Sequence, residues 1–180
     1  MLYGRSDIFS TCFLRDRIRH SVFILAETDP DMPVHSETRK LPYSAEQMYD
    51  LVADISAYPQ FLPWCSAARI RLRATEGERE TVEADLVVSF KVFRESFASR
   101  VELWSKAKKI DTQYLEGPFK HMKSSWEFVD TPSGCDVQFF VDFEFKNALL
   151  QGIIGVVFNE AMQRIVRAFE SRANTLYGKS

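Results

Sequence analysis

The chain has 180 residues, of which 46% are hydrophobic and 27% are charged, and its formal net charge is −2. This composition is typical of one globular domain, and the near-neutral charge argues against a protein that binds polyanions over its whole surface. No apolar run approaches the ~20 residues that a membrane-spanning helix needs, so we expect a soluble protein. The three cysteines, Cys12, Cys65 and Cys135, are far apart and form no CxxC pair, which favours reduced thiols in the cytoplasm.

The first 33 residues differ from the rest of the chain. They mix arginines with acidic residues, and their longest apolar run, residues 22–26, is too short for a secretory signal. We expect residues 1–33 to be a poorly ordered N-terminal extension and residues 34–180 to form the folded domain. Two further interpretations stay open, namely translation that begins at Met32 and a targeting role for the extension.

The folded domain is expected to begin with a strand and two short helices. Residues 35–41 form the strand, and Ser44 is a suitable N-cap for the first helix because Gln47, three residues later, completes a capping box. The second short helix is expected to break before Pro59, since the residue that precedes a proline is pushed away from helical geometry. An aromatic loop at residues 61–65 follows.

Six further segments alternate apolar and polar residues, as half-buried strands do. Short turns separate them, for example at residues 76–78 and 131–134, so that successive strands should be antiparallel neighbours. The predicted strands cover residues 68–73, 82–90, 97–103, 110–114, 122–128 and 137–145.

Residues 149–177 contain no proline and carry apolar side chains at three- and four-residue steps, which predicts one long amphipathic helix. The order of elements indicates an α+β helix-grip fold, in which a curved antiparallel sheet of about six to seven strands wraps around the C-terminal helix. A sheet that bends around a helix leaves space near the start of that helix, where we expect a ligand cavity.

Several motifs occur in an order that resembles a known family. They lie at residues 58–65 (YPQFLPWC), 93–99 (FRESFAS), 117–119 (GPF) with 126–128 (WEF), and 143–150 (FEFKNALL). Over residues 34–178 the chain resembles the coenzyme Q-binding branch of the START-like, polyketide-cyclase superfamily. The resemblance implies a ubiquinone (polyprenyl quinone) carrier or chaperone that supports respiration and has no cofactor chemistry of its own. The resemblance does not distinguish these quinone-binding members from bacterial members of the same family named ribosome association toxins.

The alternating strands and the helix stripe predict the walls of a START-like ligand-binding cavity. The aromatic loop is expected to act as a lid, or alternatively to cap the edge of the sheet. The predicted ligand-binding residues are Tyr58, Phe61, Trp64, Leu86, Val88, Phe97, Tyr114, Phe119, Trp126, Phe139, Val141, Phe143, Ile154, Val157, Phe158 and Ala161.

The long helix begins with an apolar segment, residues 148–158, which we call the apolar collar. Gln151 is its one clearly polar residue. Ile153 and Val156 lie off the core stripe and are expected to be partly exposed, where they meet a membrane or a partner. Alternatively, the aromatic loop covers them. Gly152 and Gly155 weaken the helix by roughly 1 kcal/mol each against alanine, and either close packing on the sheet or a hinge accounts for them.

Catalysis has little support in this sequence. Its histidines, His20, His35 and His121, are scattered, and it contains no metal-ligand pair, P-loop or nucleophile elbow. We therefore expect a binding protein rather than an enzyme, without catalytic residues, a metal or a cofactor.

Basic residues form three groups, which we expect on a solvated face; contact with phosphates of lipid or ribosomal RNA is the alternative. Two functions stay open. The first is a cytoplasmic quinone carrier with peripheral contact to the inner membrane. The second is a toxin of a type II toxin–antitoxin pair that binds the large ribosomal subunit and blocks subunit association. DNA is not an expected partner. The groups are Arg69, Arg71 and Arg73; Lys106, Lys108 and Lys109; and Lys120, His121 and Lys123.

Overall fold

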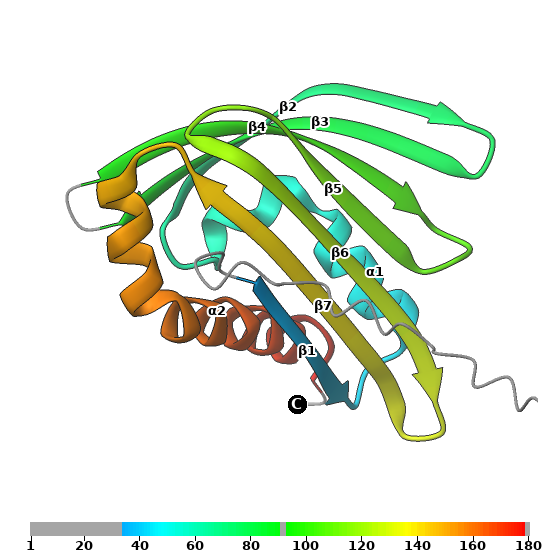
Figure 1. Ribbon diagram of the computed structural model, residues 1–180. Helices are drawn as coiled ribbons and strands as arrows, with labels where there is room; N and C mark the ends of the chain where they lie inside the picture. Colours follow the sequence, from blue (N-terminus) through cyan, green and yellow to red (C-terminus); the bar gives the residue numbers. More distant parts are fainter. Residues whose placement is uncertain (1–33, 91–92, 179–180) are drawn as a thin grey trace, which may run out of the picture.

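The computed structural model describes residues 34–90 and 93–178 (Figure 1). The predictions about residues 1–33, including their poor order and the start at Met32, lie outside the described residues. The order of elements is the predicted one: a strand, two short helices, six strands and a long helix. The elements are β1 (Val34–Leu41), α1 (Ala45–Ala53), the 3-10 helix η1 (Ile55–Gln60), β2 (Cys65–Glu76), β3 (Arg79–Phe90), β4 (Phe93–Trp104), β5 (Lys109–Glu116), β6 (Phe119–Thr131), β7 (Gly134–Phe145) and α2 (Ala148–Tyr177).

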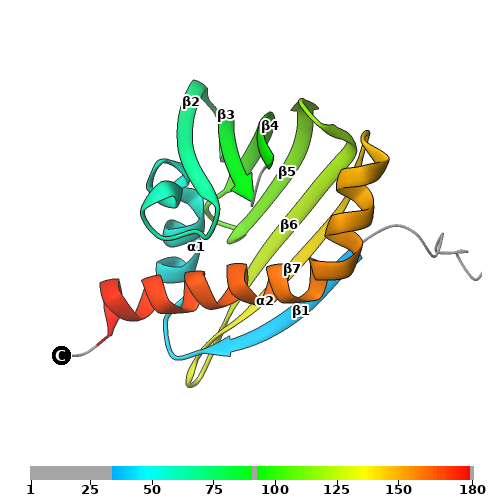
Figure 2. The same cartoon turned by 90° about the vertical axis from the view of Figure 1, so that its left-hand side faces the viewer.

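The strands form one seven-stranded sheet in the order β1-β7-β6-β5-β4-β3-β2, and all neighbours are antiparallel. Figures 1 and 2 show that the sheet curves, that α2 crosses its concave side, and that α1 lies beside the C-terminal half of α2. This is the α+β helix-grip fold that the sequence predicts.

Side-chain caps fix where both α-helices begin. The Ser44 hydroxyl accepts a hydrogen bond from the backbone N–H of Gln47, and the Gln47 side chain accepts one from the N–H of Ser44, so the predicted capping box is confirmed. At the start of α2, the side-chain oxygen of Asn147 accepts a hydrogen bond from the N–H of Leu149 at 2.8 Å. Each cap satisfies backbone donors that a helix leaves unpaired.

The prediction that the second short helix breaks before Pro59 is wrong, because η1 runs through Pro59 to Gln60. A short 3-10 helix loses only one hydrogen bond because of the missing proline N–H. The backbone N–H groups of Phe61 and Leu62 both donate to the carbonyl oxygen of Tyr58, at 3.2 and 2.9 Å, and these two hydrogen bonds close the turn.

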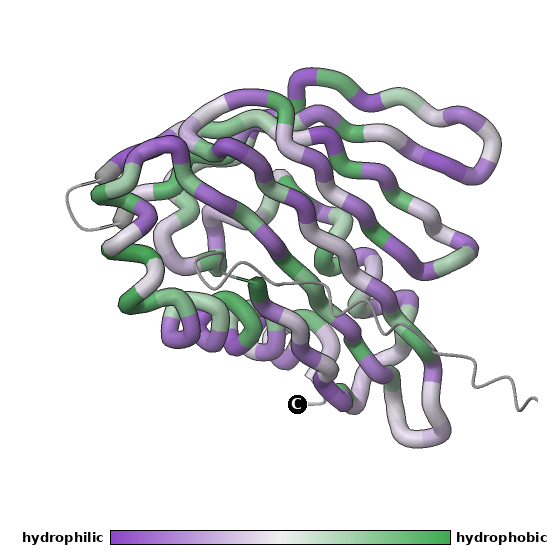
Figure 3. The backbone as a smooth tube through the Cα atoms, in the orientation of Figure 1, coloured by the Kyte–Doolittle hydropathy of each residue, from purple (hydrophilic) through white to green (hydrophobic). Residues whose placement is uncertain are grey.

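The core divides into two clusters. Figure 3 shows hydrophobic and hydrophilic residues alternating along the strands. Apolar side chains of the strands pack with those of α2 in both clusters. The first cluster joins α1 and η1 to the C-terminal part of α2 and includes Met48, Val82, Phe128 and Phe169. The second cluster joins β6 and β7 to the middle of α2 and consists of Phe119, Phe139, Val141, Phe143, Phe158, Ala161, Met162 and Val166.

Helix α2 is continuous over its 30 residues but bends within its first half (Figures 1 and 2). Its C-terminal part lies along the sheet, whereas the apolar collar turns toward the ends of β7, β3 and β4.

Candidate ligand site

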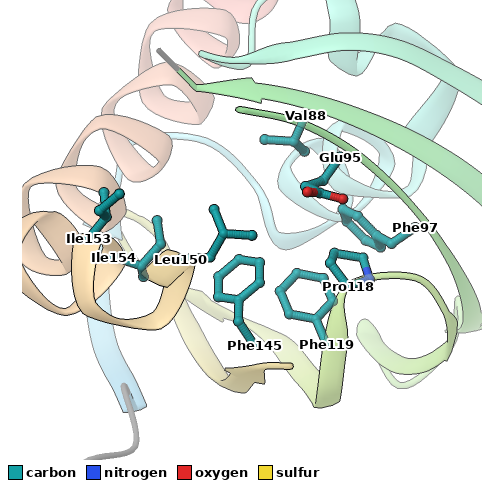
Figure 4. Close-up of a pocket in the computed structure, with 9 residues that line it drawn as sticks. All are labelled: Val88, Glu95, Phe97, Pro118, Phe119, Phe145, Leu150, Ile153 and Ile154. Atoms are coloured by element: carbon teal, nitrogen blue, oxygen red, sulfur yellow. The ribbon is translucent and has the colours of Figure 1, made fainter. Parts of the chain in front are cut away.

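A cavity of about 90 Å³ lies between the apolar collar and the end of the sheet (Figure 4). Four strands of the sheet, β3, β4, β6 and β7, and the collar each supply part of its wall, and the side chains from α2 face those from the strands. Except for the carboxylate of Glu95, the lining side chains are apolar, so the cavity favours a hydrophobic occupant. The lining residues are Val88, Glu95, Phe97, Pro118, Phe119, Phe145, Leu150, Ile153 and Ile154.

Strand register brings the sheet side of the wall together. Val88 of β3 lies opposite Glu95 of β4, and Phe97 is two residues further along the same face of β4. Phe119 at the start of β6 lies opposite Phe145 at the end of β7, with ring centroids 4.6 Å apart. The cavity therefore forms where four strands end close to the start of α2.

Phe119 connects the cavity to the aromatic cluster beneath it. Its ring contacts Phe97, Tyr114 and Phe143 edge-to-face, with centroids 5.3, 5.6 and 5.6 Å away. Edge-to-face contacts of this kind are a favoured arrangement of aromatic rings. The floor of the cavity is thus a set of interlocked rings rather than flexible aliphatic side chains.

The hydroxyl of Tyr114 is a polar atom buried in this apolar region. It has no hydrogen-bond partner among residues 34–90 and 93–178. The ammonium group of Lys146 lies 5.9 Å from the centre of the Tyr114 ring. It donates a hydrogen bond to the carbonyl oxygen of Gly117 at 3.0 Å. A buried, unpaired hydroxyl costs about 1–3 kcal/mol, which a suitable ligand oxygen would recover.

A sequence profile of one protein family, described as polyketide cyclase / dehydrase and lipid transport, matches residues 41–170. The chain belongs to this family. The ribosome association toxins RatA of Rickettsia prowazekii and of Escherichia coli K12 are 39% and 40% identical to it, over 76% and 81% of this chain and 92% and 90% of theirs. The coenzyme Q-binding protein COQ10 homolog B of Xenopus laevis is 33% identical over 81% of this chain and 59% of its own length.

Solved structures of other proteins share the fold. The 18 kDa protein CC1736 of Caulobacter crescentus superposes with a TM-score of 0.70 at 36% identity and covers 82% of this chain and all of its own. The ZhuI aromatase/cyclase of a Streptomyces species has a TM-score of 0.65 at 18% identity, over 79% of this chain and 94% of its own, which shows a common fold alone. The names of the RatA and COQ10 relatives do not describe enzymes.

Twelve of the sixteen predicted ligand-binding residues line the cavity, belong to the cluster beneath it or pack against that cluster. Val88, Phe97, Phe119 and Ile154 line the cavity itself. Trp126 and Trp64 pack against the same cluster from its edge, and Trp126 stacks on Phe139 with centroids 4.1 Å apart. The remaining six residues, which form or contact the second cluster, are Tyr114, Phe139, Val141, Phe143, Phe158 and Ala161.

Tyr58 and Phe61, predicted as parts of a lid, do not line the cavity and instead pack in the first cluster, as does Leu86. The Tyr58 hydroxyl donates a hydrogen bond to the carbonyl oxygen of Val52 at 2.6 Å, and its ring meets Phe169 edge-to-face. Burial raises the pKa of Tyr58 above its ordinary range. Both side chains therefore pack in the core formed by α1, η1 and α2.

Val157, predicted as a wall of the cavity, lies instead in an open groove of about 370 Å³ on the outside of α2. In a straight helix of about 3.6 residues per turn, Val157 would share the inner stripe with Leu150 and Ile154. In the bent helix it lines the groove rather than the cavity. The groove is lined by Ala148, Leu149, Gly152, Ile153, Val156 and Val157, and Ile153 therefore belongs to the walls of both the groove and the cavity.

The collar is exposed, as the sequence predicts. Val156 is 87% exposed and Leu149 64% exposed, so the aromatic loop does not cover them. A Cβ atom added at Gly152 or Gly155 would have no atom within 4 Å, which removes close packing as the reason for these glycines. A hinge remains as the interpretation, since glycine is a common cause of helix bending.

Sequence reasoning missed five lining residues. Leu150 belongs to the apolar stripe of the helix, Phe145 to the apolar face of the last strand, and Ile153 to the collar. The sequence therefore marks all three as apolar positions but does not place them in the cavity. Pro118 and Glu95 occur in the motifs GPF and FRESFAS, where only the register of β3 with β4 and of β6 with β7 reveals that they share a cavity with α2.

The basic groups of the surface are largely neutralised by acidic neighbours. Arg71 lies 2.7 Å from Asp85, and Arg73 lies 2.9 Å from Glu80. Such pairing lowers the positive potential that would attract phosphates. The other pairs are Lys106–Glu78, Lys108–Glu46, Lys109–Asp111, Lys120–Glu144, His121–Asp142 and Lys123–Asp142.

The described part of the chain contains no group of three or more His, Cys, Asp or Glu side chains that could hold a metal ion. Within the same residues, none of the helices combines the length and the hydropathy needed to cross a bilayer.

Proposed function

We propose that this chain binds a polyprenyl quinone of the ubiquinone class in the cavity beneath the apolar collar, and that it carries the quinone for respiratory electron transport. The observation that supports this most is the unpaired Tyr114 hydroxyl, buried among the aromatic rings beside an apolar cavity. A ligand with an apolar body and ring oxygens suits both properties. The similarity to the coenzyme Q-binding protein COQ10 homolog B supports the same ligand class.

The size of the cavity implies that the collar moves when a ligand enters. A cavity of about 150 Å³ accommodates benzene, whereas the cavity here is about 90 Å³ and a substituted quinone ring is larger than benzene. Leu150, Ile153 and Ile154 form the wall on the side of α2. Gly152 lies between Leu150 and Ile153, and Gly155 follows Ile154, so that a change of bend at these positions would enlarge the cavity at low cost.

The exposed side of the collar suits peripheral contact with a membrane, where polyprenyl quinones reside. Its groove is apolar and shares Ile153 with the cavity, so a displaced collar would open the cavity toward the surface that touches the lipid. An apolar helix face of this kind binds in the interface of a bilayer without crossing it.

Filling the cavity tests the proposal. In Ile154→Trp the larger side chain would occupy the cavity, and we expect the purified protein to retain much less quinone, measured by mass spectrometry of organic extracts. Val156→Trp is the matched control, because it adds the same indole on the exposed face of the same helix. A wild-type protein that carries no quinone after expression and takes none up from vesicles would contradict the proposal.

Ribosome association is the second candidate function. It is favoured by the RatA relatives, whose identity of 39–40% extends over about nine tenths of their own length. Binding through rRNA phosphates would fall steeply as salt rises, and replacing Arg69, Arg71 and Arg73 with Ala would weaken it further. Co-sedimentation with large ribosomal subunits and with liposomes across a salt series separates the two functions. Tight, salt-sensitive binding to the subunit without liposome binding would favour the second.

A further inference from the structure

Glu95 places a carboxylate at a cavity that is otherwise apolar. It lies on the same face of β4 as Phe97 and opposite Val88 of β3, and all three side chains line the cavity (Figure 4). Its side chain is partly buried. Between residues 34–90 and 93–178, no hydrogen bond or ion pair engages this carboxylate, in contrast to the many paired acids on the outer surface.

The two polar groups of this region differ in what they can bind. A carboxylate only accepts hydrogen bonds, whereas the Tyr114 hydroxyl is free to donate one. The oxygens of an oxidised quinone only accept hydrogen bonds. They can accept one from Tyr114, but the negative carboxylate of Glu95 repels them. The hydroxyl groups of the reduced hydroquinone both donate and accept, and they can therefore satisfy both residues.

From this arrangement we infer that Glu95 makes the cavity selective for the reduced form of its ligand, a prenylated hydroquinone, over the oxidised quinone. The inference rests on the proposed function, because it concerns the headgroup of a ligand in the same cavity. Glu95 is the residue that distinguishes the two redox forms, and Tyr114 binds both alike. No electron transfer by the protein is involved.

Anaerobic equilibrium dialysis with decylubiquinone and decylubiquinol tests this selectivity. We expect the wild-type protein to bind the reduced probe about tenfold more tightly, since hydrogen bonds to charged groups are the stronger ones. Glu95→Gln, whose amide both donates and accepts, should bring the ratio of the two affinities close to one. Tyr114→Phe is the matched control: it should weaken both affinities by a similar factor and keep their ratio.

A measurement on the wild-type protein alone covers the case in which a variant does not fold. Tenfold tighter binding of the reduced form raises the two-electron midpoint potential of the bound probe by about 30 mV relative to the free probe. An unchanged or lowered potential, or equal affinities for the two probes, would overturn the inference and leave the proposed function intact. If the wild-type protein binds neither probe, the proposed function itself fails.

Discussion

Gln151 holds the start of α2 to the end of β7, because its side-chain oxygen accepts a hydrogen bond from the backbone N–H of Phe145 at 2.9 Å. Phe145 lines the cavity, and Gln151 is the polar residue within the otherwise apolar collar. The hydrogen bond therefore holds the N-terminal end of the collar against β7. Gly152 is the next residue along the chain, and Gly155 lies three residues further. This arrangement explains how a collar with two glycines keeps a defined position.

Replacing Gln151 with Leu should release this contact. The backbone N–H of Phe145 loses its partner, so we expect a loss of about 1–2 kcal/mol in the free energy of unfolding and faster exchange of the Phe145 amide hydrogen. Urea denaturation and hydrogen-exchange NMR measure the two effects. Asn159→Ala, at an exposed position of the same helix, serves as the control. Unchanged protection of the Phe145 amide in Gln151→Leu would show that the contact does not hold the collar.

Alanine at both Gly152 and Gly155 should stiffen the collar. Because neither new Cβ meets another atom within 4 Å, the helix gains its intrinsic preference for alanine, roughly 1 kcal/mol per position, without steric cost. We expect higher stability in urea and slower release of bound quinone in stopped-flow experiments.

A glycine with a different role provides the control for that experiment. A Cβ at Gly134 would lie 1.9 Å from the backbone oxygen of Leu41, and its φ of +145° disfavours other residues, so Gly134→Ala should destabilise the protein. If the double alanine variant releases quinone as fast as the wild type, the glycines are not the hinge.

Removal of the Tyr114 hydroxyl should stabilise the ligand-free protein. The buried oxygen has no partner in the described residues, and Phe at this position avoids a desolvation cost of about 1–3 kcal/mol. Thermal and urea unfolding of Tyr114→Phe without ligand measure the gain. The same change should weaken quinone binding, so stability and affinity move in opposite directions. A variant that is destabilised by more than about 1 kcal/mol would mean that the hydroxyl has a structural partner.

Serine at both Ile153 and Val156 should weaken association with liposomes, because it removes apolar area from the exposed side of the collar. The effect should depend little on salt. Leu176→Ser, which changes an exposed leucine at the other end of α2, is the matched control and should bind as the wild type does. Equal losses of liposome binding in the two variants, measured by co-sedimentation, would argue against the collar as the membrane contact.

Asp142 should contribute to stability in a pH-dependent way. Burial works to raise the pKa of this carboxylate, but hydrogen bonds from His121 and Lys123 outweigh burial, and the pKa lies below its ordinary value. A carboxylate with a lowered pKa in the folded state stabilises the protein above the unfolded pKa of about 4, and this contribution is lost as pH falls through the folded pKa. Unfolding of Asp142→Asn should therefore show a weaker loss of stability below about pH 4. If the free energy of unfolding falls with pH equally in the variant and the wild type, the prediction is wrong.

Local patterns in the sequence were sufficient for the elements and the fold class. Alternation predicted six of the seven strands, the capping box at Ser44 predicted the start of α1, and the apolar stripe predicted α2. Each of these signals depends on residues close together in the chain, so one sequence suffices to detect them. The failure at Pro59 has the same origin, since a rule for α-helices does not describe a 3-10 turn.

The composition of the cavity was decided only by the tertiary structure. Sequence patterns identify an apolar face but not which part of it packs against which other face, and so Tyr58 and Phe61 were assigned to a lid although they pack on Phe169. Val157 lines the outer groove rather than the cavity, which the apolar stripe of a straight helix does not reveal. Glu95 became part of the site through the pairing of β3 with β4. The sequence thus determined which segments fold and how, whereas the contacts between distant segments determined where a ligand can bind.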